Sequence, residues 1–346
     1  MRKLLIGFAV VLVVALALYL RFRHPSGPAE VTYAGNREVT LWSTTAQVRE
    51  PVTTAKYGER LDVLTRSQDQ VRVRTASGEM GWVSEEDLMS ADLWQRANDL
   101  AAAAAKAPVE ARGHTHAISN LHVEAGRESP RIRQLNKNVP VELFARKVVE
   151  VAASTTLVSP SGAGEKETSA APTESSGGAP AKKEDWWLVR AQLPDQTSVA
   201  GWILGRFVDL DVPAPLPDYA SAAAMRIVAW FELNHAIASS GETKPQFLVV
   251  GSRGPEGQPC DFTMLRVFTW GAKRERYETA YVESGVCGRL PVSLTPPSAK
   301  SADVTFSFDD IGNGAQEKRV YRMERTIVRR VREGGQEPVK RKHARG

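Results

Sequence analysis

The chain has 346 residues, 42% of them hydrophobic and 25% charged, and its formal net charge is +5. The length excludes a single ordinary domain, and the composition excludes a chain that is mostly disordered. The net charge is modest, and basic residues gather from Lys318 to the end of the chain, where a tail of this kind either stays solvated or binds an anionic surface.

The chain begins with an apolar segment, Leu4 to Leu20, that no charged residue interrupts. As a helix it would be about 26 Å long, the lower end of what spans the hydrocarbon core of a bilayer. The apolar run continues past Ala15 and Ala17, where a signal peptidase would cut, and Tyr19 lies where an interfacial aromatic belongs. We therefore predict a transmembrane anchor over 1–24, with a cleaved signal peptide as the alternative. The flanking basic residues do not decide its orientation.

After a Pro/Gly-punctuated linker, 25–36, short runs of period-2 alternation predict a small antiparallel β-barrel over 37–90. The runs are Arg60–Leu64, Val71–Arg74 and Met80–Val83. A linker helix is expected over 91–108, since Ser90 can cap it and Pro108 stops it.

A second copy of this pattern predicts another barrel over 109–211. The run 139–144 aligns with Arg60–Leu64, Trp187–Arg190 with Val71–Arg74, and Ala200–Ile203 with Met80–Val83. An insertion rich in Ser, Ala, Gly, Pro and Thr interrupts the second copy at 152–184 and is expected to be disordered.

The last domain is predicted to be an antiparallel β domain over 219–333, between a Pro-rich linker, 212–218, and a basic disordered tail, 334–346. A short helix is expected from Tyr219 to Met225. Seven strands are then expected at 226–233, 246–252, 262–270, 277–283, 290–294, 304–308 and 319–331. The whole fold class is thus mainly β: a transmembrane helix, two small barrels and a C-terminal β domain.

Both cysteines of the chain, Cys260 and Cys287, fall in this last domain. In an oxidising compartment a disulfide between them would stabilise the domain by about 3 kcal/mol. The alternative is two buried thiols in a reducing compartment.

The two copies resemble bacterial SH3-type domains of cell-envelope and cell-wall proteins. The resemblance lies in Tyr57–Val63, Val71–Arg74 and Gly78–Val83, with Trp82 in the motif before the last turn. The second copy supplies Trp186 and Trp187 but has Asn138 near the position of the leading glycine. The resemblance implies a binding or scaffold role outside the cytoplasmic membrane with peptidoglycan or peptide as ligand, and it favours the disulfide.

No arrangement of residues indicates catalysis, a metal or a cofactor. Cys260 would need a downstream histidine to act as a nucleophile, and only His343 in the basic tail follows it. His114 and His116 would share one face of a strand, but no carboxylate motif accompanies them. We therefore expect no enzyme, no metal and no cofactor.

Aromatic residues are the best candidates for ligand binding: Tyr57, Trp82, Trp186 and Trp202. Trp82 and Trp202 hold the same motif position, where a tryptophan either packs in the core or lines a groove. Trp186 and Trp187 are adjacent, so one is expected to face inward and the other outward.

The sequence thus predicts a single-pass protein of the bacterial cytoplasmic membrane, largely extracytoplasmic, that binds a peptide or a cell-wall glycan. Its partners would be the membrane, and peptidoglycan or an envelope protein, rather than nucleic acid. The alternative is an accessory or regulatory subunit of an envelope enzyme, acting through the C-terminal β domain. A third hypothesis is a cytosol-facing anchor whose basic tail meets lipid or nucleic acid.

Overall fold

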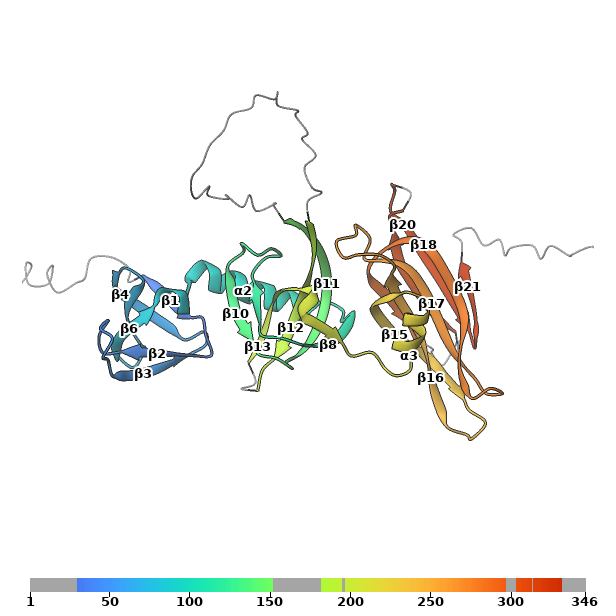
Figure 1. The fold of residues 1–346 in the computed structure, drawn as a ribbon, viewed down its shortest axis with the longest axis horizontal. Helices are drawn as coiled ribbons and strands as arrows, with labels where there is room; N and C mark the ends of the chain where they lie inside the picture. The colour runs from blue at the N-terminus through green and yellow to red at the C-terminus, as the bar shows by residue number, and fades with distance from the viewer. Residues whose placement is uncertain (1–29, 152–181, 195–196, 297–302, 313, 332–346) are drawn as a thin grey trace, which may run out of the picture. The chain divides into compact units, whose positions relative to one another are not determined.

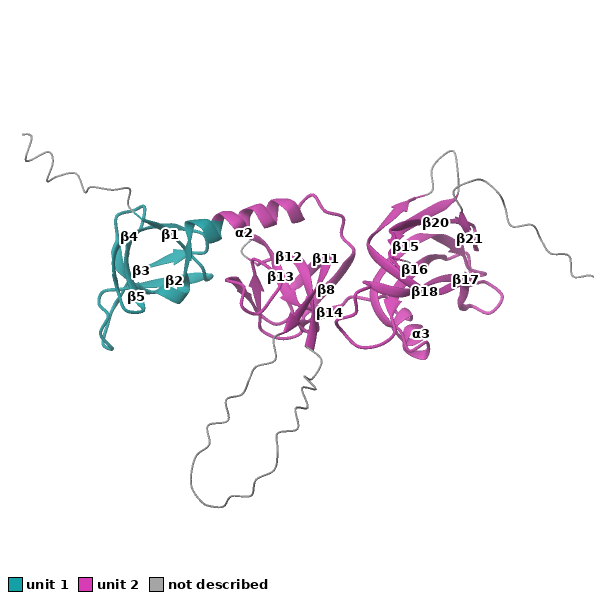
Figure 2. Ribbon diagram, turned by 90° about the horizontal axis from the view of Figure 1, so that it is seen from above, with its two compact units in different colours: residues 1–94 teal, residues 95–346 magenta. Residues whose placement is uncertain are grey.

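The computed structural model describes residues 30–151, 182–194, 197–296, 303–312 and 314–331. These residues form three antiparallel sheets of seven strands each (Figure 1). The chain divides into two compact units, residues 1–94 and 95–346 (Figure 2). The first unit holds one sheet, and the second unit holds the other two.

The first sheet runs in the order β3-β2-β6-β5-β4-β1-β7. Side chains alternate between the two faces of each strand, and the inward ones form the core, such as Leu41, Leu61 and Val73, each 0% exposed. The 3₁₀ turn Glu85–Asp87 precedes the last strand. The strands are β1 (Val31–Ala34), β2 (Glu38–Trp42), β3 (Pro51–Lys56), β4 (Arg60–Ser67), β5 (Gln70–Arg74), β6 (Met80–Ser84) and β7 (Leu88–Ser90).

Helix α2 (Ala91–Ala104) follows β7 directly. The Leu93 N–H donates to Ser90 Oγ at 3.1 Å, so Ser90 caps the helix as the sequence predicts. In the first unit, the Trp94 ring stacks on Tyr33 at 5.1 Å. It also covers Gly58, whose φ of +76° and lack of a side chain make room for the indole.

The second sheet has the same strand order as the first, β10-β9-β13-β12-β11-β8-β14. Asn138 has a φ of +62° just before β11, as Gly58 has before β4, so an asparagine that tolerates the left-handed region replaces the glycine there. The strands are β8 (Ala111–Thr115), β9 (Ser119–His122), β10 (Arg131–Leu135), β11 (Pro140–Val151), β12 (Lys182–Gln192), β13 (Ser198–Leu204) and β14 (Val208–Leu210). Residues 182–184 therefore belong to a strand, and the remainder of the predicted insertion lies outside the described residues.

The C-terminal sheet is a meander in which each strand pairs with the next along the chain. Helix α3 (Leu216–Ala222) precedes it and buries Leu216 and Ala220 against one face. Seven strands were expected, but they divide differently: 276–295 is one long strand, and 317–331 is a hairpin. The strands are β15 (Arg226–Ile237), β16 (Thr243–Ser252), β17 (Phe262–Gly271), β18 (Arg276–Thr295), β19 (Val304–Asp310), β20 (Glu317–Glu324) and β21 (Ile327–Val331).

The structure corrects the predicted fold class. The two small SH3-like barrels are wrong in form, because each is a sheet with two edge strands (β3 and β7, then β10 and β14) rather than a closed barrel. The predicted anchor, 1–24, lies outside the described residues, and none of the helices that the structure describes is long and apolar enough to cross a membrane. The single-pass location in a bacterial cytoplasmic membrane is therefore withdrawn, since no described helix supports it.

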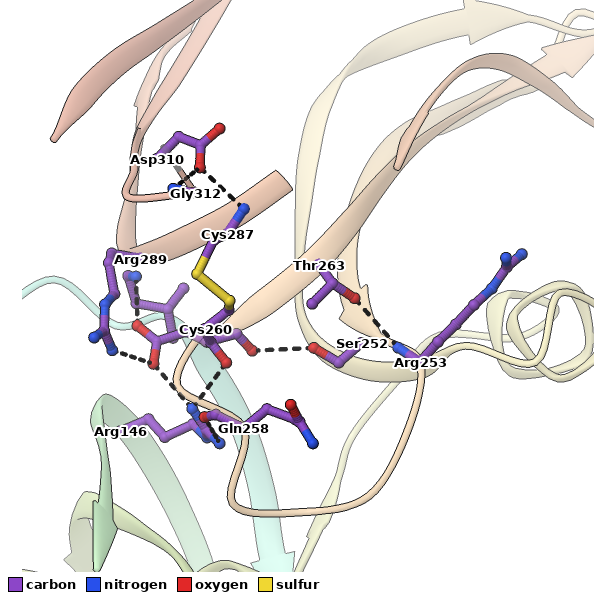
Figure 3. Close-up of a disulfide and its surroundings, with 12 residues drawn as sticks. Arg146, Ser252, Arg253, Gln258, Cys260, Thr263, Cys287, Arg289, Asp310 and Gly312 are labelled. Atoms are coloured by element: carbon purple, nitrogen blue, oxygen red, sulfur yellow. Dashed lines mark hydrogen bonds and ion pairs between the residues drawn. A yellow bond between two sulfur atoms is a disulfide. The ribbon is translucent and has the colours of Figure 1, made fainter. Parts of the chain in front are cut away.

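Inside the second unit, a buried arginine joins the second sheet to the C-terminal sheet. Arg146 of β11 has 1% of its side chain exposed and contacts Asp185 of β12 at 2.5 Å and Asp261 at 3.2 Å. Its guanidinium also donates to the carbonyl oxygens of Cys260 and Gln258, both at 3.0 Å (Figure 3). The loop that receives Arg146 thus comes directly before β17.

A disulfide braces this loop. Cys260 and Cys287 are bonded to each other, with their Cα atoms 4.8 Å apart (Figure 3). The Asp310 carboxylate accepts from the Cys287 and Gly312 N–H groups at 3.0 and 2.9 Å, which fixes the other side of the bond. Asp261, next to Cys260, accepts the Leu290 N–H at 2.9 Å. The loop is therefore held by covalent and polar contacts together.

Candidate binding site

The outer face of the first sheet carries two tryptophans side by side. Trp42 ends β2, Trp82 lies in β6, and the two are direct cross-strand partners. Their chain neighbours Leu41, Gly81 and Val83 are buried, so the alternation of the strands turns both indole rings away from the core. Each tryptophan is half-buried. The pair therefore forms an aromatic surface open to a ligand, which we call the tryptophan face.

Gly81 permits the close approach of β2 to β6 that creates this pair. A Cβ at Gly81 would lie 2.7 Å from Leu41 Cβ and 3.1 Å from the Trp42 backbone nitrogen. Because any larger residue would push β2 away, only glycine fits without a shift of the strand. Gly81 thus positions Trp42 beside Trp82.

Two arginines add positive charge to the tryptophan face. The Arg49 guanidinium carbon lies 4.4 Å from the centre of the Trp42 ring, and Arg72 is the cross-strand partner of Trp82. Neither arginine has an ion-pair partner among the residues that the structure describes. Arg74, two residues further along β5, lies 3.8 Å from Asp62 instead. The face therefore offers π surface and uncompensated guanidinium groups together.

The second sheet repeats this arrangement in altered form. His122 and Trp202 are cross-strand partners there, and Gly201 again permits the approach, since a Cβ on it would lie 2.8 Å from Leu121 Cβ. The His122 ring meets Trp186 edge to face at 5.3 Å. Histidine thus replaces one tryptophan of the pair.

The four predicted aromatic residues do not form one site. Trp82 lies on the tryptophan face, while Tyr57 packs edge-on against Trp94 at 5.7 Å in the same unit. In the second unit, Trp202 lies at the position equivalent to Trp82, and Trp186 is only 2% exposed. The expectation that Trp186 and Trp187 face opposite environments is wrong, because both are buried.

Sequence reasoning missed the two arginines of the tryptophan face. A signal for Arg72 was present, since it alternates with the buried Val71 and Val73 and so shares the outward side of its strand. No comparable signal existed for Arg49, which lies between β2 and β3 and reaches Trp42 from there.

The residues weighed for catalysis or metal binding are engaged elsewhere. Cys260 is in the disulfide and has no free thiol to act as a nucleophile. His114 contacts Asp211 at 2.8 Å, and His116 contacts Asp209 at 3.4 Å. Within the described residues, no group of three His, Cys, Asp or Glu side chains could hold a metal ion.

A concave surface lies on the C-terminal sheet. This groove of about 520 Å³ runs between the segment 213–219 and the starts of β16 and β18. Trp270 packs edge-on against Tyr277 at 5.2 Å, and the Lys244 amine lies 5.2 Å from the Trp270 ring. Its wall thus combines aromatic rings with charged side chains, as ligand grooves often do.

Comparison with known proteins does not assign the chain to a family. No family model matches it, and no curated protein matches it either. Three solved structures align with much of the chain. NlpC2 from Trichomonas vaginalis is 9% identical, with 88% of this chain and 97% of that chain covered and a TM-score of 0.17, and NlpC1 from the same organism is 10% identical, with 87% and 89% covered and a TM-score of 0.17. An NlpC/P60 family protein from Bacillus cereus ATCC 10987 is 11% identical, with 73% of this chain and 94% of that chain covered and a TM-score of 0.21. These scores are too low for the similarity to bear on fold or function.

Proposed function

We propose that this chain is a non-enzymatic binding and scaffold protein whose first sheet holds a peptide or a cell-wall glycan on the tryptophan face. The observation that carries the proposal is the outward cross-strand pair of Trp42 and Trp82, with Arg49 over one ring. Tryptophan and arginine are among the residue types that contribute most to binding surfaces, because each offers a large planar group for contact with a ligand.

The resemblance to bacterial SH3-type domains remains a proposal and supports this function. It suggests which ligands to test first, since peptide and peptidoglycan are typical ligands of that family. The identical strand order of the two sheets supports the view that the chain contains two versions of one module.

Sedimentation with purified peptidoglycan, together with binding to peptides derived from it, tests the proposal. Trp82→Ala removes one ring of the face and is expected to weaken binding about tenfold or more, as the loss of a central aromatic contact does. Trp202→Ala is the matched control, because it removes a tryptophan at the equivalent register of the second sheet.

The comparison of the two variants decides the outcome. Binding that falls in Trp82→Ala but persists in Trp202→Ala supports the tryptophan face. Wild-type protein that binds neither ligand, or equal losses in both variants, would contradict the proposal. Circular dichroism of both variants establishes that the sheets remain folded.

A second candidate function rests on the groove of the C-terminal sheet. Its aromatic and charged wall favours an accessory or regulatory subunit that contacts an enzyme through this domain. In that case Trp270→Ala would abolish co-purification with the enzyme and leave binding at the tryptophan face unchanged.

A further inference from the structure

The strand registers of the first two sheets match residue by residue. Each sheet has a β-bulge at the same place: at Leu64 of β4, where β4 pairs with β5, and at Phe144 of β11, where β11 pairs with β12. On the next strand, Arg72 pairs with Trp82 as Leu188 pairs with Trp202. Two further pairs are equivalent: Arg74 with Met80, and Arg190 with Ala200.

In the second sheet, this patch is covered by a helix. Phe144 and Ala200 are 5% and 2% exposed because Ala104 of α2 packs on them, and Ala101 and Leu188 join the cluster. Ala101 and Ala104 lie three residues apart on one side of α2, and their small side chains let the helix approach the sheet closely. The outer face of the module is therefore a surface on which a helix can pack.

In the first sheet, the equivalent patch is open. We call it the docking patch and define it as Leu64, Arg72 and Met80. Leu64 is 39% exposed and Met80 is 47% exposed, although both are large apolar residues. Arg72 stands where the second sheet has Leu188 and has no ion-pair partner among the described residues.

We propose that the docking patch binds an α-helix of a partner protein. The inference rests on the proposed function and specifies the partner as a helical peptide segment rather than a glycan. The helix presents small residues such as alanine three or four positions apart, as α2 does on the second sheet. It also carries an acidic residue beside that stripe, because the arginine in place of leucine must find a carboxylate when the partner covers it.

The contacts of the two sheets explain why the first patch carries an extra positive charge and the second does not. In the second sheet the Arg190 guanidinium carbon lies 5.2 Å from the Phe144 ring and the group bonds to Glu142, so the charge is satisfied beneath the helix. In the first sheet the corresponding Arg74–Asp62 pair exists, and Arg72 is an additional charge beside the apolar residues. The docking patch is thus selective for a helix of opposite charge.

Two labelled alanine-based helical peptides of about 20 residues provide the probe, long enough to form a helix in water. One carries glutamates beside its alanine stripe, and the other carries lysines at the same positions. Fluorescence anisotropy with the full chain measures the affinity of each. The variants are Met80→Glu, Arg72→Glu and, as a matched control elsewhere, Ile237→Glu, which adds the same charge at an apolar residue that is 73% exposed on β15.

We expect the glutamate peptide to bind and the lysine peptide not to bind. Met80→Glu weakens binding of the glutamate peptide about tenfold. Arg72→Glu reverses the preference, so that the lysine peptide binds better by about fivefold, and this reversal distinguishes direct contact from general damage to the sheet. Ile237→Glu changes neither affinity.

Other results would overturn the proposal in distinguishable ways. If the chain binds peptidoglycan through Trp82 but neither peptide, the proposed function stands and the helical partner is wrong. If sedimentation velocity shows a dimer that Met80→Glu dissociates while neither peptide binds, the occupant is a second copy of the chain. If neither glycan nor peptide binds, both proposals fail.

Discussion

The buried arginine of the second unit gives the sharpest test of the fold. Arg146→Met removes the charge and keeps most of the side-chain volume. Two carboxylates, Asp185 and Asp261, are then left 3% and 5% exposed without their common partner. Each keeps one backbone N–H bond, from Gly257 at 2.9 Å and from Leu290 at 2.9 Å.

The expected loss of stability follows from these contacts. Removal of one partner of a buried ion pair costs about 3–5 kcal/mol, because the remaining charge stays desolvated. The surviving backbone bonds and the half-exposed Arg289, 3.4 Å from Asp261, place the loss near the lower end, at about 3 kcal/mol. For a domain of this size that corresponds to a fall in melting temperature of about 6–12 °C.

Differential scanning calorimetry with the disulfide intact measures this change. Arg274→Met is the control, because Arg274 forms an exposed ion pair with Glu278 and should contribute at most about 0.5 kcal/mol. A melting temperature of Arg146→Met within 2 °C of wild type, about the shift of a 1 kcal/mol change, would refute the view that Arg146 holds the two sheets together.

Two further predictions concern stability. Burial, the largest cause, together with the nearby Asp261 charge raises the pKa of Glu110 to about 7, although the Val292 N–H bond opposes the shift. The folded state then holds the Glu110 proton more tightly than the unfolded state does, so the contribution of Glu110 to stability falls by about 3 kcal/mol as pH rises from about 4.5 to 7. Thermal unfolding across this range should show the stability of wild type falling by this amount relative to that of Glu110→Gln. Gly81→Ala forces a methyl group against Leu41 and is expected to cost about 1–3 kcal/mol in urea unfolding of the first unit, whereas an unchanged midpoint would mean that β2 moves freely.

The alignment of the two sequence copies agrees with the structure, since the aligned runs Val71–Arg74 and Trp187–Arg190 occupy equivalent positions in the first two sheets. The period-2 alternation of apolar and polar residues within each run was enough for this alignment. It did not reveal that Trp186 and Trp187 are both buried. Trp186 packs against His122, and Trp187 lies against Gly205 in the 3₁₀ turn Gly205–Phe207, and alternation along one strand predicts neither contact.

The C-terminal sheet shows where turn signals mislead. The predicted strands 277–283 and 290–294 are parts of a single strand, β18, which continues through Gly285 and Gly288 with irregular register. The real turn between β20 and β21 has Arg325 at a φ of +56°, where no glycine or asparagine marks it. The Arg146 network was equally hidden, since it joins residues 115 positions apart in the chain.

The most direct test of the tryptophan face is the set of eight tryptophan indole N–H signals in an NMR spectrum of the full chain. On titration with a soluble peptidoglycan fragment or a bound peptide, the signals of Trp42 and Trp82 should shift in a saturable way while the others stay in place. Shifts confined to Trp230 and Trp270 would move the site to the C-terminal sheet and contradict the proposal.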